Sequence, residues 1–129
     1  IINISGPTDL TAPEVAGLMT FSGMFAGRDD INEQFKIASP VYLPTETLPP
    51  LLTLHCREDG VVDFEQAKRI EAVWDQKQAD FQGFYYHGTA KSSHNIWIEE
   101  KQSPDLLPAL ENQILCFLKS YLGVDPKAG

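Results

Sequence analysis

The chain has 129 residues, and its 10 lysines and arginines against 18 aspartates and glutamates give a formal net charge of −8. Hydrophobic residues make up 43% and charged residues 22%, which is typical of a single folded globular domain. The acidic balance argues against a nucleic-acid partner, because binding the phosphate backbone needs a cationic face. No apolar run approaches the roughly 18 residues of a membrane span, so we expect no membrane-spanning segment.

The two cysteines, Cys56 and Cys116, lie 60 positions apart. Neither stands in a spacing typical of a metal site or of a disulfide scaffold. We therefore expect two separate thiols, and the cysteines leave the cellular compartment open. The chain shows no internal repeat and no domain boundary.

The first part of the chain predicts a strand and then a helical segment. The apolar, β-branched run Ile1–Ile4 predicts a buried strand that leads into a turn. The segment Thr11–Ala26 is mostly apolar. Pro13 suits the first turn of a helix, and Glu14 suits the positive end of its dipole.

A short helix and a second strand are expected next. Asp29 and Asp30 predict the N-cap of a helix that runs to about Ala38 and is ended by Pro40. The continuous apolar run Leu51–His55 is typical of a strand that is covered on both faces, as in a parallel sheet.

The second half of the chain predicts a helix, a strand and a final helix. Asp63 and Gln66 form a capping-box pattern at the start of an amphipathic helix. The aromatic-rich run Phe81–Tyr86 predicts a strand. The last helix is expected to open at Ser103-Pro104 and to end at Gly123. Its apolar side comprises Leu107, Leu110, Ile114, Leu115, Leu118 and Leu122.

This alternation predicts an α/β fold with a parallel sheet of about three strands and flanking helices. In such folds functional groups gather beyond the carboxyl ends of the strands. Asp59 follows the second predicted strand, and His94 follows the third. An acid and then a histidine is the order of the last two members of a Ser-Asp-His triad, in which the carboxylate orients the imidazole.

Other residues near the same edge leave alternatives open. Glu58 and Asp63 are alternative acids, although Asp63 is better explained as a helix cap. His87 is an alternative base, whereas His55 is expected to be a structural histidine satisfied by neighbouring loops. Ser5 and Ser22 each precede a glycine and precede Asp59 in the chain, which makes them alternative nucleophiles, although neither stands in a nucleophile elbow.

The segment Leu51–Val62 resembles the acid-bearing segment of α/β-hydrolase esterases and lipases, acetyl esterases and carboxylesterases among them. That family carries two prolines, an apolar strand and His-Gly-x-x-Asp, and then a valine, which Val62 matches. Phe84–Gly88 followed by His94 resembles its histidine segment, and Phe117–Leu122 resembles its closing helix. Cys56 departs from the pattern, since the family has glycine there, and the stretch between Gly88 and His94 is longer than usual.

The resemblance covers only the second half of such a domain. No serine stands in a Gly-x-Ser-x-Gly elbow, since Gly23 and Gly27 have Phe25 between them. We therefore expect residues 1–129 to be the C-terminal portion of a single α/β-hydrolase domain, with the serine and the oxyanion hole upstream. The expected partner is the missing N-terminal half or a second copy of the chain, which would cover the strand Ile1–Ile4.

The resemblance implies a carboxylic ester hydrolase in which Asp59 orients His94 and His94 acts as the general base. Its substrate would be a small-molecule acyl ester, and no metal or organic cofactor is implied. A prolyl-oligopeptidase-type serine peptidase has the same order of acid and histidine. A noncatalytic α/β binding module is the alternative outside the enzymes.

Overall fold

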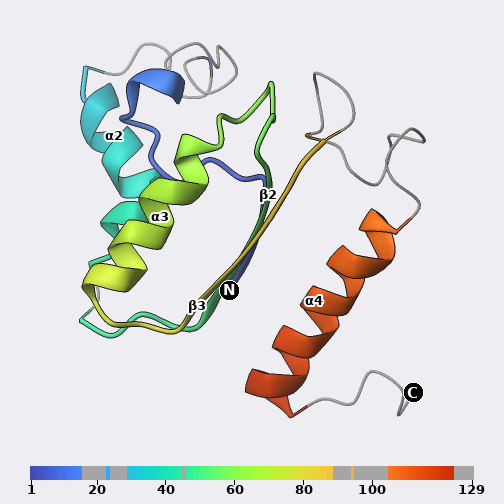
Figure 1. Cartoon of the computed structure of the whole chain (residues 1–129). Helices are drawn as coiled ribbons and strands as arrows, with labels where there is room; N and C mark the ends of the chain where they lie inside the picture. The colour runs from blue at the N-terminus through green and yellow to red at the C-terminus, as the bar shows by residue number, and fades with distance from the viewer. Residues whose placement is uncertain (16–22, 24–28, 45, 89–93, 95–104, 124–129) are drawn as a thin grey trace.

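The computed structural model describes residues 1–15, 23, 29–44, 46–88, 94 and 105–123. Three parallel strands form one sheet in the order β1-β2-β3; they are β1 (Ile2–Ile4), β2 (Leu51–Cys56) and β3 (Phe81–Tyr86). Helices α2 (Ile31–Ala38) and α3 (Glu65–Gln76) lie on one side of this sheet, and α4 (Leu106–Leu122) lies on the other (Figure 1). The predicted α/β fold with three parallel strands and flanking helices is confirmed.

Strand β2 lies at the centre of the sheet, and all six of its residues are buried. It pairs with β1 through Ile2 and Leu52 and with β3 through Leu52 and Gln82. The prediction of a strand covered on both faces is confirmed. The prediction that Ile1–Ile4 is a buried strand is wrong in part, because Ile4 is 40% exposed. Within the described residues β1 pairs only with β2, so its outer edge stays open.

Two apolar clusters hold helices α3 and α4 to opposite faces of the sheet, because successive residues of a strand point to opposite sides. Leu52 and Leu54 of β2 pack in one cluster with Leu110 and Phe117 of α4. On the other face, Leu51 packs in a cluster with residues of α3 that include Trp74. The indole N–H of Trp74 also donates to the carbonyl of Pro49 at 2.9 Å.

Helix α4 buries a narrower side than its sequence predicts. Leu110 and Phe117 are buried, whereas Leu115 and Leu122 are 41% and 66% exposed. The helix ends at Gly123, whose positive φ of 63° is the left-handed conformation that glycine adopts most readily. The predicted opening at Ser103-Pro104 lies outside the described residues. None of the helices in the described ranges is long and apolar enough to cross a membrane.

The region before β2 matches its prediction in part. Helix α2 follows Asp30 as expected, but the Asp30 carboxylate accepts a hydrogen bond from the Gln34 side chain, not from the helix backbone. Pro40 ends the helix and begins the short 3₁₀ helix η2 (Pro40–Tyr42). Of the predicted helix in Thr11–Ala26, the described part contains the 3₁₀ helix η1 (Pro13–Val15), and residues 16–22 and 24–26 lie outside the described residues.

Helix α3 begins at Glu65, two residues later than its capping pattern predicts. Asp63 does accept a hydrogen bond from the backbone N–H of Glu65, at 2.8 Å. The side chain of Gln66 does not return to Asp63, so the predicted capping box is wrong. Its oxygen accepts the backbone N–H groups of Thr8 and Asp9, both at 2.8 Å.

Gln66 thereby ties helix α3 to the loop that follows β1. Its own backbone carbonyl accepts the hydroxyl of Thr8 at 2.6 Å, and its amide group donates to Glu14 at 2.9 Å. Glu14, expected at the positive end of a helix, also receives two hydrogen bonds from Arg69, the shorter at 2.5 Å. Long-range polar contacts therefore fix this loop at the carboxyl end of the sheet.

The pair between Glu14 and Arg69 predicts a pH dependence of stability. The Arg69 guanidinium holds the pKa of Glu14 below its ordinary value of 4.5. A carboxyl whose pKa is lowered on folding stabilises the fold above that ordinary pKa, and this contribution is lost as the pH falls through the folded pKa. Glu14→Gln should therefore cost stability at pH 7, and the difference from the wild type should shrink below about pH 4.5.

Urea unfolding of both proteins at neutral and at acidic pH measures this difference. The exposed Glu33 of α2 supplies the control, since Glu33→Gln should show no such trend. A difference between wild type and Glu14→Gln that stays constant with pH would contradict the prediction.

Candidate active site

Asp59 and His94 meet beyond the carboxyl ends of neighbouring parallel strands. Asp59 lies in the turn after β2, and His94 lies beyond the end of β3, 35 positions later in the chain. The Nδ1 atom of His94 and the Oδ2 atom of Asp59 are 2.9 Å apart. The side chain of Asp59 is fully buried and that of His94 is 24% exposed. The structure therefore brings together the two residues that the sequence predicts as acid and base.

The turn itself holds the carboxylate of Asp59. Its Oδ1 atom accepts the backbone N–H groups of Val61 and Val62, both at 2.9 Å. An ionised carboxylate can only accept hydrogen bonds, so three N–H partners suit it. With Oδ1 engaged by the backbone, Oδ2 is left to the imidazole. In this arrangement His94 donates through Nδ1 and carries a bare Nε2.

A second histidine lies against the same carboxylate. The Nε2 atom of His55 is 2.9 Å from the carbonyl of Val62 and 3.6 Å from Oδ2 of Asp59. Burial lowers the pKa of His55, so its imidazole is neutral at pH 7 and donates Nε2–H to the carbonyl. Its buried Nδ1 has no hydrogen-bond partner among the described residues. His55 thus has the expected structural contact at Nε2 but not, within the described residues, at Nδ1.

The approach of His55 to Asp59 was not predicted, although the sequence carries a signal for it. The signal was the spacing of the two residues, because His55 ends the buried run and Asp59 stands four positions later, after a tight turn. A turn of that length returns the acid towards the strand from which it started.

The two alternative residues, Glu58 and His87, pair with each other. Nδ1 of His87 lies 2.6 Å from one oxygen of Glu58, and the backbone N–H of Gly88 donates to the other at 2.9 Å. The hydrogen bond from His87 lowers the pKa of Glu58 to about 2. Both side chains are exposed, 75% for His87 and 47% for Glu58. From the sequence, Glu58 and His87 are alternatives to Asp59 and His94. In the structure they form a second carboxylate–imidazole pair.

Of the two candidate nucleophiles, the structure describes Ser5. Ser5 follows β1 and is buried, with a positive φ of 47° that a serine adopts only at some cost. Its hydroxyl has no hydrogen-bond partner among the described residues, so it is bonded to none of the three imidazoles. Ser22 lies outside the described residues. Asp63, the other alternative acid, caps the start of α3.

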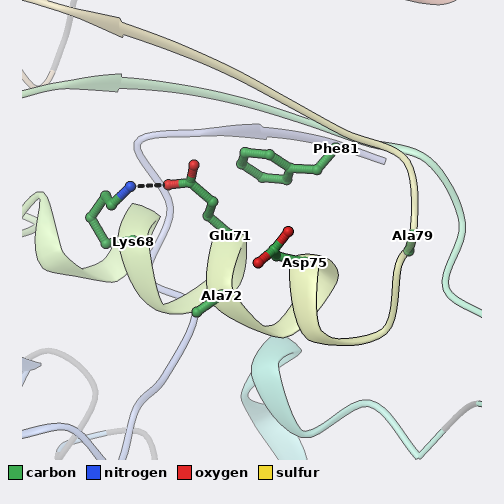
Figure 2. Close-up of a pocket in the computed structure, with 6 residues that line it drawn as sticks. All are labelled: Lys68, Glu71, Ala72, Asp75, Ala79 and Phe81. Atoms are coloured by element: carbon green, nitrogen blue, oxygen red, sulfur yellow. Dashed lines mark hydrogen bonds and ion pairs between the residues drawn. The ribbon is translucent and has the colours of Figure 1, made fainter.

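A hollow of about 520 Å³ lies elsewhere, between α3 and the start of β3 (Figure 2). Lys68 and Glu71 form an ion pair on its wall, and Glu71 also accepts the hydroxyl of Tyr85 at 3.1 Å. Burial, together with Glu71, raises the pKa of Tyr85. Neither Asp59 nor His94 lines this hollow, so it is separate from the carboxylate–imidazole pair.

No cluster of three or more histidine, cysteine or acidic side chains arranged to hold a metal ion occurs within the described ranges. Cys56 is buried and Cys116 is exposed. Comparison with known protein families, with curated proteins and with solved structures gave no match.

Proposed function

We propose that Asp59 and His94 are the acid and the base of a serine hydrolase of the esterase or lipase type, which acts on small carboxylic esters. The observation that carries this proposal is the 2.9 Å contact between His94 Nδ1 and a buried carboxylate oxygen of Asp59. Each residue follows one of two neighbouring parallel strands. The same order of acid and histidine is used in Ser-Asp-His triads of α/β folds.

The chemistry follows from the contacts of the two side chains. Asp59 is held by the backbone of Val61 and Val62, so its carboxylate meets His94 in one orientation. Because Nδ1 of His94 faces that carboxylate, Nε2 is free to take the proton of a serine hydroxyl as the serine attacks the acyl carbonyl. The imidazolium then returns the proton to the leaving alcohol. Water releases the acyl group by the same steps in reverse.

In this proposal the serine belongs to a part of the protein that precedes Ile1, together with the oxyanion hole. Residues 1–129 would then form the C-terminal portion of an α/β-hydrolase domain. The outer edge of β1 pairs with no strand of the described residues, which supports this arrangement, since unpaired strand edges are commonly covered by another segment. We favour the missing N-terminal half as the segment that covers the outer edge of β1. A second copy of the chain is the alternative.

The test is ester hydrolysis by the full-length gene product, combined with labelling by a serine-directed phosphonate. We expect turnover of p-nitrophenyl acetate and a single label on a serine upstream of Ile1. Residues 1–129 alone should show neither turnover nor label. A full-length protein that hydrolyses no acyl ester and takes no label would overturn the proposal and favour a noncatalytic module. A preference for peptides cleaved after proline would favour a peptidase of the prolyl-oligopeptidase type.

Ser5 provides the decisive control for the origin of the nucleophile. Among the described serines, Ser5 is the one to exclude first, because it has a positive φ and its hydroxyl has no hydrogen-bond partner within the described residues. Ser5→Ala should leave turnover and labelling of the full-length protein unchanged. A label on Ser5, or loss of turnover in Ser5→Ala, would place the nucleophile inside this chain and contradict an upstream serine.

A further inference from the structure

Two consecutive residues of the turn after β2 hold the segment that follows β3, at two separate points. Asp59 holds His94 through one carboxylate oxygen, as described above. Its neighbour Glu58 holds the beginning of the same segment, since it binds the imidazole of His87 and the backbone N–H of Gly88. We infer that Glu58 is a positioning residue that places His94 against Asp59, an inference that rests on the proposed function.

The contacts of Glu58 extend the pairing of the two strands beyond their ends. The last strand residues, Cys56 and Tyr86, are paired in register, and the N–H of Arg57 then donates to the carbonyl of Tyr86 at 2.8 Å. Glu58 comes next and uses its side chain to reach Gly88 at 2.9 Å, where its backbone has turned away. The ladder between β2 and β3 is thus continued by a carboxylate.

The position of these contacts explains why they bear on His94. His94 stands six residues after Gly88, so a fixed Gly88 shortens the stretch of chain that must close onto Asp59. A shorter connection loses less conformational entropy when its end is fixed. A base that is held in place also meets its proton donor more often in the productive geometry. Glu58 touches neither substrate nor nucleophile in this scheme and acts through His94.

The contacts of Glu58 with His87 and with Gly88 are not expected to count equally. The ion pair with His87 joins two exposed side chains, and such pairs contribute little because water screens them. The hydrogen bond to Gly88 restrains the main chain directly and involves an ionised acceptor, which makes it the stronger type. Removal of the carboxylate should therefore matter more than removal of the imidazole.

The experiment compares Glu58→Ala, Glu58→Gln and His87→Ala in the full-length protein, with Glu33→Ala on α2 as the control. We expect Glu58→Ala to lower kcat about tenfold with an unchanged KM, because His94 is displaced while the contacts with the substrate are kept. Glu58→Gln keeps an oxygen that can accept the N–H of Gly88 and should recover most of this loss. His87→Ala should have a smaller effect than Glu58→Ala.

A second readout does not depend on hydrolysis. The proton on Nδ1 of His94 should give a slowly exchanging, low-field NMR resonance that Asp59→Asn removes. Glu58→Ala should broaden this resonance or speed its exchange, Glu58→Gln should restore it, and Glu33→Ala should not alter it. A resonance unchanged in Glu58→Ala would overturn the inference, whatever the activity. A resonance that responds as expected in a protein without esterase activity would overturn the proposed function and leave the positioning role supported.

Discussion

Asp59→Asn in the full-length protein should lower kcat for ester hydrolysis by about 10⁴-fold while the fold is kept. The asparagine oxygen can still accept the N–H groups of Val61 and Val62, so the turn is expected to survive. The amide group would then face His94 as a donor. A donor there favours the imidazole tautomer that accepts at Nδ1, which carries its proton on Nε2 and cannot take one from a serine.

The companion variant His94→Ala should lose at least as much activity, because it removes the base itself and not only its orientation. Asp63→Asn is the matched control, since Asp63 is the nearby acid of the same turn region and caps α3 through Glu65. It should keep kcat within a few-fold of the wild type. Steady-state kinetics with p-nitrophenyl acetate, together with a circular-dichroism spectrum of each variant, measure these effects. Equal losses in Asp59→Asn and Asp63→Asn would show that the turn matters only for folding.

The meeting of Asp59 and His94 was predictable because parallel strands end at the same edge of a sheet. Two apolar runs locate β2 and β3, and the residues that follow them must then lie near one another. The same reasoning could not choose among neighbours, since Glu58 and His87 satisfy it equally well. Only the course of the turn decides that Glu58 reaches Gly88 and that Asp59 reaches His94.

Partners that are distant in the sequence account for the errors in the prediction. The pattern Asp63–Gln66 is local and typical of a cap, but Gln66 finds its partners in Thr8 and Asp9, 58 and 57 positions away. No local pattern distinguishes a glutamine that closes a helix from one that crosses to another loop. The burial of β1 was overestimated for a related reason. The apolar residues of β1 are typical of a buried strand. The exposed fraction of their side chains, however, depends on which strands and helices pack beside β1.

Gln66→Leu should therefore destabilise the protein strongly, although it replaces a polar residue by an apolar one inside the fold. Gln66 is fully buried, and its side chain is the acceptor for two buried backbone N–H groups, those of Thr8 and Asp9. Leucine fills a similar volume but leaves both donors unpaired. Each buried donor left without a partner costs about 1–3 kcal/mol. We expect the free energy of unfolding to fall by about 3 kcal/mol or more, measured by urea titration.

Gln76→Leu provides the control, because Gln76 ends the same helix and is exposed. It makes the identical chemical change without removing a buried acceptor, so its effect should stay within about 0.5 kcal/mol. Gln66→Glu is a second variant. Its carboxylate keeps an acceptor for the N–H groups of Thr8 and Asp9, but it cannot donate to Glu14 and faces Glu14 as a like charge. It should be destabilising at pH 7 and should recover as the pH is lowered towards 4. Equal stability of Gln66→Leu and Gln76→Leu would show that the loop after β1 is held by other contacts.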